Sequence, residues 1–118
     1  MLDYELSLPP GLDRYGIGVI GAGFIVRDCH LPAYHAAGFR VVGITSRTRA
    51  RADEVAAARQ VPRVFNTVDD LLADPDISVI DIAVPPQDQP ALIRRVLERG
   101  QNIRGILAQK PLAMTLAD

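Results

Sequence analysis

Few aromatic residues, a single cysteine and no long apolar run characterise this sequence of 118 residues. With no Trp, three Tyr and three Phe, the chain has few side chains on which nucleic-acid bases stack. Its 13 basic residues are balanced by 14 acidic residues and form no concentrated patch, so we expect no nucleic-acid partner. No apolar run approaches the ~20 residues of a membrane-spanning helix, and Asp3 and Glu5 stand where a secretory leader is basic, so we expect no membrane association.

Cys29 has no second cysteine in the sequence with which to form a disulfide or a metal site, which fits a reducing compartment. We therefore predict a cytoplasmic protein with no bound metal, in which Cys29 packs within a helix. The composition, 48% hydrophobic and 23% charged, is ordinary for a soluble globular protein. A chain of this length predicts one hydrophobic core.

Short apolar segments alternate with helical patterns along the chain, and glycine or proline separates most of them. The apolar segments predict strands at residues 15–20, 39–45, 64–65, 77–84 and 103–107. The helical patterns predict helices at 24–37, 48–60, shortly after 67 and at 89–99. Pro32 must start, kink or interrupt the first of these helices. The alternation predicts a doubly wound, mostly parallel α/β sheet in one domain of residues 14–118, after an N-terminal arm of residues 1–13.

Two overlapping glycine patterns occur near the end of the first predicted strand. The pattern Gly16-x-Gly18-x-x-Gly21 matches the dinucleotide fingerprint literally but lies inside the strand, where it cannot form the turn that approaches pyrophosphate. Gly21 and Gly23 instead follow the strand and precede a helix, the context in which a helix N-terminus binds phosphate. The third small position of this second pattern falls on Val26, so the fingerprint is incomplete. The turn predicts a dinucleotide site or, alternatively, a plain connection between strand and helix.

Ser46 and Arg47 follow the second predicted strand, where an acidic residue would bind the adenosine ribose of NAD. The guanidinium of Arg47 can instead pair with the 2′-phosphate of NADP, and Ser46 can donate its hydroxyl. This favours NADP over NAD and leaves both open. The structural alternative is a solvated arginine, because Arg47, Arg49 and Arg51 form a run at the start of a surface helix.

Four segments together resemble the glucose-fructose oxidoreductase, inositol dehydrogenase and MocA family (Gfo/Idh/MocA). The segments are GVIGAGFI at 18–25, HLPAY at 30–34, IAVPP at 82–86 and AQKPLA at 108–113. They keep the family's order and spacing from about residue 15 to the end of the chain. The resemblance implies a Rossmann fold that binds NAD or NADP, as a single domain lacking the C-terminal domain that holds a sugar, cyclitol or similar substrate in family members.

The resemblance also implies roles for individual residues. Lys110 occupies the position of the lysine in the family's Glu-Lys-Pro motif, which reaches both cofactor and substrate, and is therefore the implied catalytic residue. Gln109 replaces the usual glutamate, while Pro86 and Gln89 stand where the family often has asparagine and histidine. His30 is expected to shape the first helix. The residues expected to bind the cofactor are Gly21, Gly23, Phe24, Ile25, Ser46, Arg47, Val84, Pro85, Pro86, Gln89, Gln109 and Lys110.

In family members the residues that bind substrate lie beyond the position of Asp118. We therefore expect the chain to be inactive alone, and its exposed apolar surface to favour a homo-oligomer or contact with the missing domain. The main prediction is the nucleotide-binding half of an oxidoreductase that transfers hydride between nicotinamide and a CH–OH carbon. The alternatives are a non-catalytic module that binds NADP(H) or coenzyme A, and an oligomeric scaffold that has lost ligand binding, which the bulky Val26 would suit.

Overall fold

The computed structural model describes residues 15–108, and within them every strand of the sheet is parallel. The strands are β1 (Gly16–Ile20), β2 (Arg40–Thr45), β3 (Arg63–Phe65), β4 (Ile77–Ile82) and β5 (Gly105–Ala108). The helical segments are η3 (Val26–His30), α1 (Leu31–Ala37), α2 (Arg49–Arg59), α3 (Val68–Leu72), η4 (Pro86–Asp88) and α4 (Gln89–Arg99). The predicted α/β alternation is confirmed. The longest of these helices have 11 residues, so none within residues 15–108 could cross a membrane.

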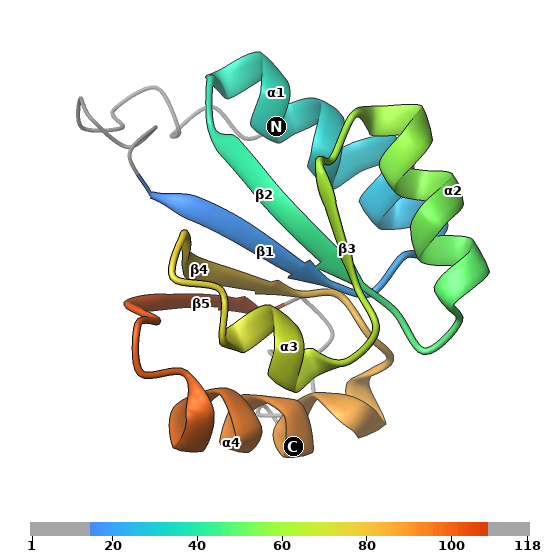
Figure 1. The fold of residues 1–118 in the computed structure, drawn as a ribbon. Helices are drawn as coiled ribbons and strands as arrows, with labels where there is room; N and C mark the ends of the chain where they lie inside the picture. The colour runs from blue at the N-terminus through green and yellow to red at the C-terminus, as the bar shows by residue number, and fades with distance from the viewer. Residues whose placement is uncertain (1–14, 109–118) are drawn as a thin grey trace.

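The strand order is β3-β2-β1-β4-β5. From β1 the chain moves outward through β2 to β3, then returns to the other side of β1 to build β4 and β5. Helices α1 and α2 cover one face of the sheet, and α3 and α4 cover the other (Figure 1). The strand order therefore reverses between β1 and β4, and this is where open parallel sheets form a crevice for ligands.

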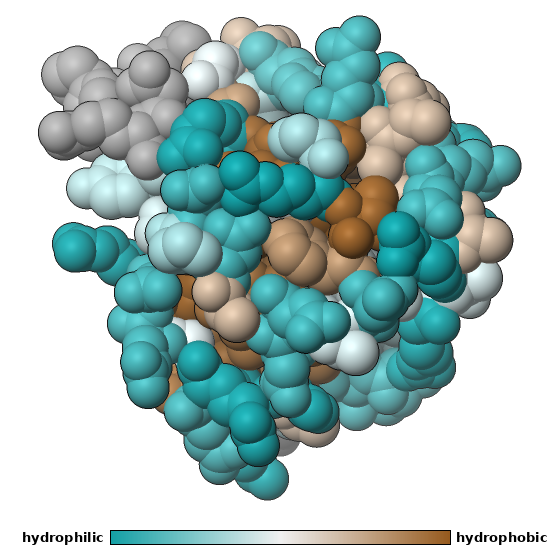
Figure 2. Space-filling view, in the orientation of Figure 1, coloured by the Kyte–Doolittle hydropathy of each residue, from teal (hydrophilic) through white to brown (hydrophobic). Residues whose placement is uncertain are grey.

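The hydrophobic core has two layers, one on each face of the sheet. Val19, Leu31 and Val55 belong to the layer beneath η3, α1 and α2. Leu71, Ile80 and Val96 belong to the layer beneath α3 and α4. On the face seen in Figure 2, hydrophilic residues cover most of the surface and hydrophobic residues show mainly toward its centre. Coverage on both faces explains why the strands read as nearly continuous apolar runs.

The first predicted helix forms, but a π-helical turn interrupts it. Helical backbone begins at Phe24, widens into the π-turn η3 and continues as α1 up to the C-cap Gly38. Pro32 is the second residue of α1, and it lacks the N–H that a regular helix would direct to the carbonyl of Asp28. The wider turn just before Pro32 accommodates that missing donor.

Several details differ from the sequence-based expectations. Cys29 is exposed, so the prediction that it packs within a helix is wrong, because the π-turn directs it outward. Leu97 continues the apolar stripe of α4 in sequence, yet it is exposed while its neighbour Val96 is buried in the core layer. Strand β5 begins at Gly105, two residues later than predicted, because residues 100–103 form a turn in which the N–H of Ile103 donates to the carbonyl of Gly100 at 3.0 Å. The N-terminal arm and residues 109–118 lie outside the described residues.

Candidate cofactor site

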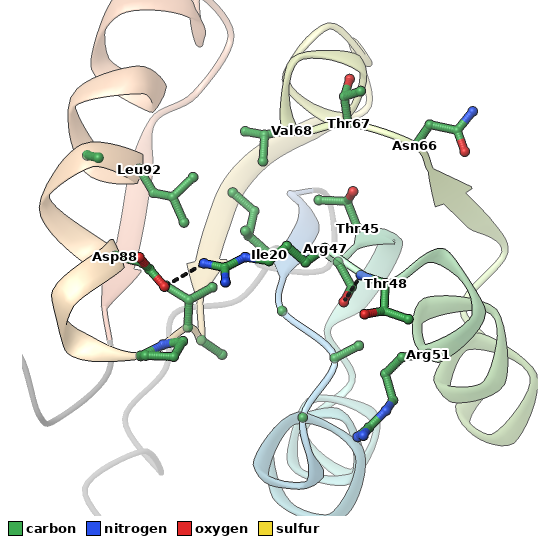
Figure 3. Close-up of a pocket in the computed structure, with 18 residues that line it drawn as sticks. Ile20, Thr45, Arg47, Thr48, Arg51, Asn66, Thr67, Val68, Asp88 and Leu92 are labelled. Carbon is green, nitrogen blue, oxygen red and sulfur yellow. Dashed lines mark hydrogen bonds and ion pairs between the residues drawn. The ribbon is translucent and has the colours of Figure 1, made fainter.

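A cleft of about 740 Å³ opens at the carboxyl ends of β1, β2, β3 and β4. Its size falls in the range of small-molecule sites, about 300–1,000 Å³. It lies at the reversal of strand order, between the start of α4 and the loop that leads from β2 into α2 (Figure 3). The lining residues are Ile20, Gly21, Ala22, Gly23, Thr45, Ser46, Arg47, Thr48, Arg51, Asn66, Thr67, Val68, Ala83, Val84, Pro85, Asp88, Ala91 and Leu92.

The turn after β1 forms the floor of the cleft. Gly21 has a φ of 121°, a conformation that residues with a Cβ rarely adopt, and a Cβ there would lie 2.3 Å from the carbonyl oxygen of Ala83. The N–H of Gly21 donates to the carbonyl of Thr45 at 2.8 Å, and the N–H of Ala83 donates to that of Ile20 at 2.9 Å. These bonds fix the turn between β2 and β4.

Gly23 lies in the same turn, but unlike Gly21 it has open space around it. Within residues 15–108, a Cβ at Gly23 would meet no neighbouring atom within 4 Å, so its missing side chain leaves space in the cleft. Helical backbone begins at the next residue, and the first N–H groups of a helix point outward without intrahelical partners. The turn thus combines open space over a glycine with a helix N-terminus, the arrangement that receives a pyrophosphate.

The literal fingerprint inside β1 serves packing. A Cβ at Gly16 would lie 2.0 Å from the carbonyl oxygen of Asp76, and one at Gly18 would lie 2.9 Å from side-chain atoms of Ile77 and Leu71. These two glycines therefore let β4 and α3 approach the central strand. Their placement inside the strand confirms that they form no phosphate-binding turn.

Val26, at the third position of the fingerprint, is completely buried in the core layer beneath the helix. It is also the first residue of the π-turn, where the helix has an extra residue in its turn. The wider turn gives the valine room against the sheet where a small residue would normally be required. The incomplete fingerprint is therefore compatible with an intact turn.

The loop after β2 and the start of α2 supply the basic side chains of the cleft. Ser46 accepts a hydrogen bond from the N–H of Thr48 at 3.3 Å through its Oγ, and both residues line the cleft. Arg47 reaches across the cleft, and its Nη2 lies 2.6 Å from Oδ2 of Asp88 (Figure 3). Arg51, one turn further along, extends away from that pair (Figure 3). The guanidinium predicted to bind a 2′-phosphate is therefore in the cleft and already holds a carboxylate.

The connection from β4 to α4 forms the other side of the cleft. Val84 and Pro85 line it, whereas Gln89 is completely buried. The Gln89 side chain donates from Nε2 to the carbonyl of Val84 at 3.0 Å and so braces this loop from beneath. Asp88 precedes α4 as its N-cap, but its carboxylate makes no capping hydrogen bond.

A buried polar cluster supports the cleft from the side of α1. Asp81, on β4, is completely buried, and its Oδ2 accepts a hydrogen bond from the Tyr34 hydroxyl at 2.5 Å. The same oxygen lies 3.0 Å from Nδ1 of His30. Burial, together with the nearby Asp81 charge, raises the pKa of Tyr34 well above its usual value. The cluster joins the helix after the glycine turn to the central sheet, and His30 has the structural role expected for it.

Half of the predicted cofactor residues line the cleft. They are Gly21, Gly23, Ser46, Arg47, Val84 and Pro85. Phe24 and Ile25 are exposed beside the turn without lining the cleft, Pro86 belongs to η4, and Gln89 is buried. Gln109 and Lys110 lie outside the described residues. Sequence reasoning missed the other residues that line the cleft, namely Ile20, Ala22, Thr45, Thr48, Arg51, Asn66, Thr67, Val68, Ala83, Asp88, Ala91 and Leu92.

A parallel sheet whose strand order reverses beside such a glycine turn defines a dinucleotide-binding Rossmann domain. Residues 15–118 match the model of the Gfo/Idh/MocA oxidoreductase family, described as an NAD-binding Rossmann fold. The chain therefore belongs to this oxidoreductase family and contains its NAD-binding domain.

Individual relatives show the same relationship. The 1,5-anhydro-D-fructose reductase of Ensifer adhaerens is 29% identical over 101 residues, which cover 86% of this chain and 29% of the reductase. A 3-ketoreductase from Actinomadura kijaniata, solved with NADP and TDP-benzene, is similar with a TM-score of 0.73 and 28% identity over 83% of this chain and 29% of its own. GenD2 from gentamicin A biosynthesis, solved with NAD, has a TM-score of 0.75 and 26% identity over 89% of this chain and 30% of its own. The chain thus spans less than a third of each of these proteins.

Proposed function

We propose that this chain binds a nicotinamide dinucleotide in the cleft at the carboxyl ends of β1 and β2. The observation that carries the proposal is the glycine turn. Only a glycine fits the strained backbone at position 21, and Gly23 leaves the space that a pyrophosphate requires. The exposed apolar side chains of Phe24 and Ile25, next to the turn, offer a surface for the rest of the dinucleotide.

We propose NADP as the slightly favoured cofactor. Strand β2 ends at Thr45 and is followed by Ser46 and Arg47, so no acidic residue directly follows β2 to accept the ribose hydroxyls of NAD. Arg47 lies in the cleft with a guanidinium suited to a phosphate, and the Ser46 hydroxyl is beside it. Both cofactors occur among the similar structures, because the 3-ketoreductase was solved with NADP and GenD2 with NAD.

The reaction that we propose is hydride transfer between the nicotinamide and a CH–OH carbon of a sugar, cyclitol or related substrate. The anhydrofructose reductase and the 3-ketoreductase among the relatives support this substrate class. A bound nicotinamide would supply the hydride chemistry, and Lys110 would hydrogen-bond the reacting oxygen. Lys110 follows the end of β5 by two residues, and β5 ends at the same edge of the sheet as the cleft. Lys110→Ala should weaken dinucleotide binding, because Lys110 is expected to contact both cofactor and substrate, whereas unchanged affinity would favour the non-catalytic module, which has no need of this lysine.

A calorimetric titration of the 118-residue chain with NADP, NADPH, NAD and coenzyme A tests the binding proposal. We expect micromolar affinity for at least one nicotinamide nucleotide. A preference for the phosphorylated forms would support Arg47 and Ser46 as the residues that distinguish them. Tight binding of coenzyme A alone would favour a different nucleotide module, and no binding by any of the four would refute the proposal.

A further inference from the structure

Asp88 places a negative charge in a cleft that is otherwise suited to a phosphate. Among the described residues that line the cleft it is the one acidic side chain, whereas Arg47 and Arg51 are basic. Its carboxylate pairs with Arg47 at 2.6 Å across the opening (Figure 3). The cleft therefore contains both a cation suited to a phosphate and an anion opposed to one.

The position of Asp88 is fixed by the backbone around it. Pro85 and Pro86 restrict the preceding φ angles, and the N–H of Asp88 donates to the carbonyl of Pro85 at 2.9 Å. The buried Gln89 side chain holds the carbonyl of Val84 from below. The side chain of an exposed loop usually samples several conformations. The Asp88 carboxylate instead extends from a turn whose backbone is held in place at the edge of the cleft.

The carboxylate of Asp88 does not make the helix-capping hydrogen bond that is usual for an aspartate just before a helix. An aspartate at a helix N-cap normally accepts from the N–H of the second or third helical residue. Pro90 is the second residue of α4 and has no N–H, and Asp88 makes no side-chain capping bond. Its carboxylate points instead to Arg47, which reaches it from 41 positions earlier in the sequence.

We propose that Asp88 is a residue that sets the preference of the cleft between NAD and NADP. The inference rests on the proposed dinucleotide site. Arg47 stands after β2, where the adenosine ribose of a bound dinucleotide lies in this fold. The 2′-phosphate of NADP must compete with the Asp88 carboxylate for the Arg47 guanidinium and is repelled by its charge. The 2′-hydroxyl of NAD instead finds in Asp88 an anionic acceptor, supplied from α4 because none follows β2.

The pair is suited to such a competition because it is accessible. The Arg47 side chain is 80% exposed and the Asp88 side chain 33% exposed, so water screens their attraction and a ligand can separate them. A phosphate carries more negative charge than one carboxylate and offers three acceptor oxygens. The pair therefore lowers the affinity for NADP without preventing its binding.

The test is the ratio of the dissociation constants of NAD and NADP, measured by calorimetry on the 118-residue chain. Asp88→Asn removes the charge and keeps the shape. We expect the Kd of NADP to fall about threefold to tenfold and the Kd of NAD to rise about threefold, so that the ratio of the NAD constant to the NADP constant increases about ninefold to thirtyfold. In an Arg47→Gln background the gain in NADP affinity should shrink, because there is no guanidinium left to release.

Asp53→Asn is the matched control. Asp53 pairs with Arg49 along α2, carries the same charge and does not line the cleft, so the variant should leave the ratio unchanged. Equal melting temperatures of the variants would show that each is folded. Binding by the unaltered chain with the same ratio in Asp88→Asn as in Asp53→Asn overturns this inference alone. Absence of dinucleotide binding by the unaltered chain overturns the proposed function and this inference with it.

Discussion

Two acid–base pairs lie on the two sides of the glycine turn and differ in nearly every physical respect. Asp81 and His30 are 0% and 17% exposed, and Tyr34 adds a hydrogen bond to the same carboxylate oxygen. Asp88 and Arg47 lie in the open cleft. A buried charge is costly to leave without its partners, while an exposed ion pair contributes about 0–1 kcal/mol to stability. The buried cluster therefore belongs to the fold, and the exposed pair is free to serve ligand selection.

The largest expected effect comes from removing the buried carboxylate. Asp81→Ala takes the shared acceptor from Tyr34 and His30, and each buried donor left unsatisfied in this way costs about 1–3 kcal/mol. Urea denaturation followed by circular dichroism would measure the loss in the free energy of unfolding. Asp81→Asn, which keeps an acceptor oxygen, should lose less. An Asp81→Ala variant as stable as the unaltered chain would show that the cluster does not hold the fold.

Gly21→Ala should be the next most damaging change. The positive φ and the close approach to Ala83 together predict a loss of about 2–3 kcal/mol in the free energy of unfolding. The same denaturation experiment measures it, with Gly105→Ala as control. A Cβ at Gly105 would make an ordinary contact 3.9 Å from a methyl group of Val79. Equal stability of the two variants would contradict the assigned role of Gly21.

Tyr34→Phe sharpens the comparison without removing a charge. It deletes the hydroxyl that donates to Asp81 and should cost about 1–2 kcal/mol. The pKa of Tyr34 is raised above its usual 10.0 in the folded protein, so above about pH 10 the unfolded chain loses this proton while the folded chain keeps it. Stability linked to Tyr34 is thus present below pH 10 and lost as the pH rises further. The phenylalanine variant should show a shallower alkaline loss, and an identical pH profile would contradict this assignment.

Asp88→Asn should have the smallest effect on stability. Its pair with Arg47 is exposed and its carboxylate caps no helix, so we expect a change within about 0.5 kcal/mol in the free energy of unfolding. Thermal denaturation of Asp88→Asn and Asp81→Asn side by side compares what the two carboxylates contribute to stability. A loss of the same size in both variants would remove the distinction between a structural pair and a ligand-selecting pair.

Much of the fold was predictable because local sequence signals and tertiary structure agree. Apolar strands and glycine or proline boundaries located all the strands of residues 15–108, and Thr67 caps α3 as its side chain predicts, accepting from the N–H of Asp70 at 3.0 Å. The π-turn was not predictable in detail. It depends on fitting Val26 against the sheet while Pro32 lacks a donor, which is a matter of packing and not of sequence periodicity.

The site was predictable where it follows a strand directly and was missed where distant segments meet. Gly21, Gly23 and Arg47 are local to the ends of β1 and β2. Asp88 enters the cleft only because the strand order places α4 opposite the β2 loop, which no local pattern reveals. Asp81 did leave a signal, as the one charged residue of β4, whose other residues are apolar apart from Ser78. His30 and Tyr34 are four residues apart and so lie on one face of a helix. This spacing could have identified them as the partners of Asp81.

The central claim is that the space over Gly23 receives the pyrophosphate of a nicotinamide dinucleotide. The most direct test is a calorimetric titration of Gly23→Ala with NADP and NAD, beside the unaltered chain and Gly105→Ala. A Cβ at Gly23 touches no neighbouring atom of the part of the chain that the structure describes, so the variant should fold normally and yet bind at least about tenfold more weakly. Unchanged affinity in a normally folded Gly23→Ala protein would contradict the claim and place the ligand elsewhere.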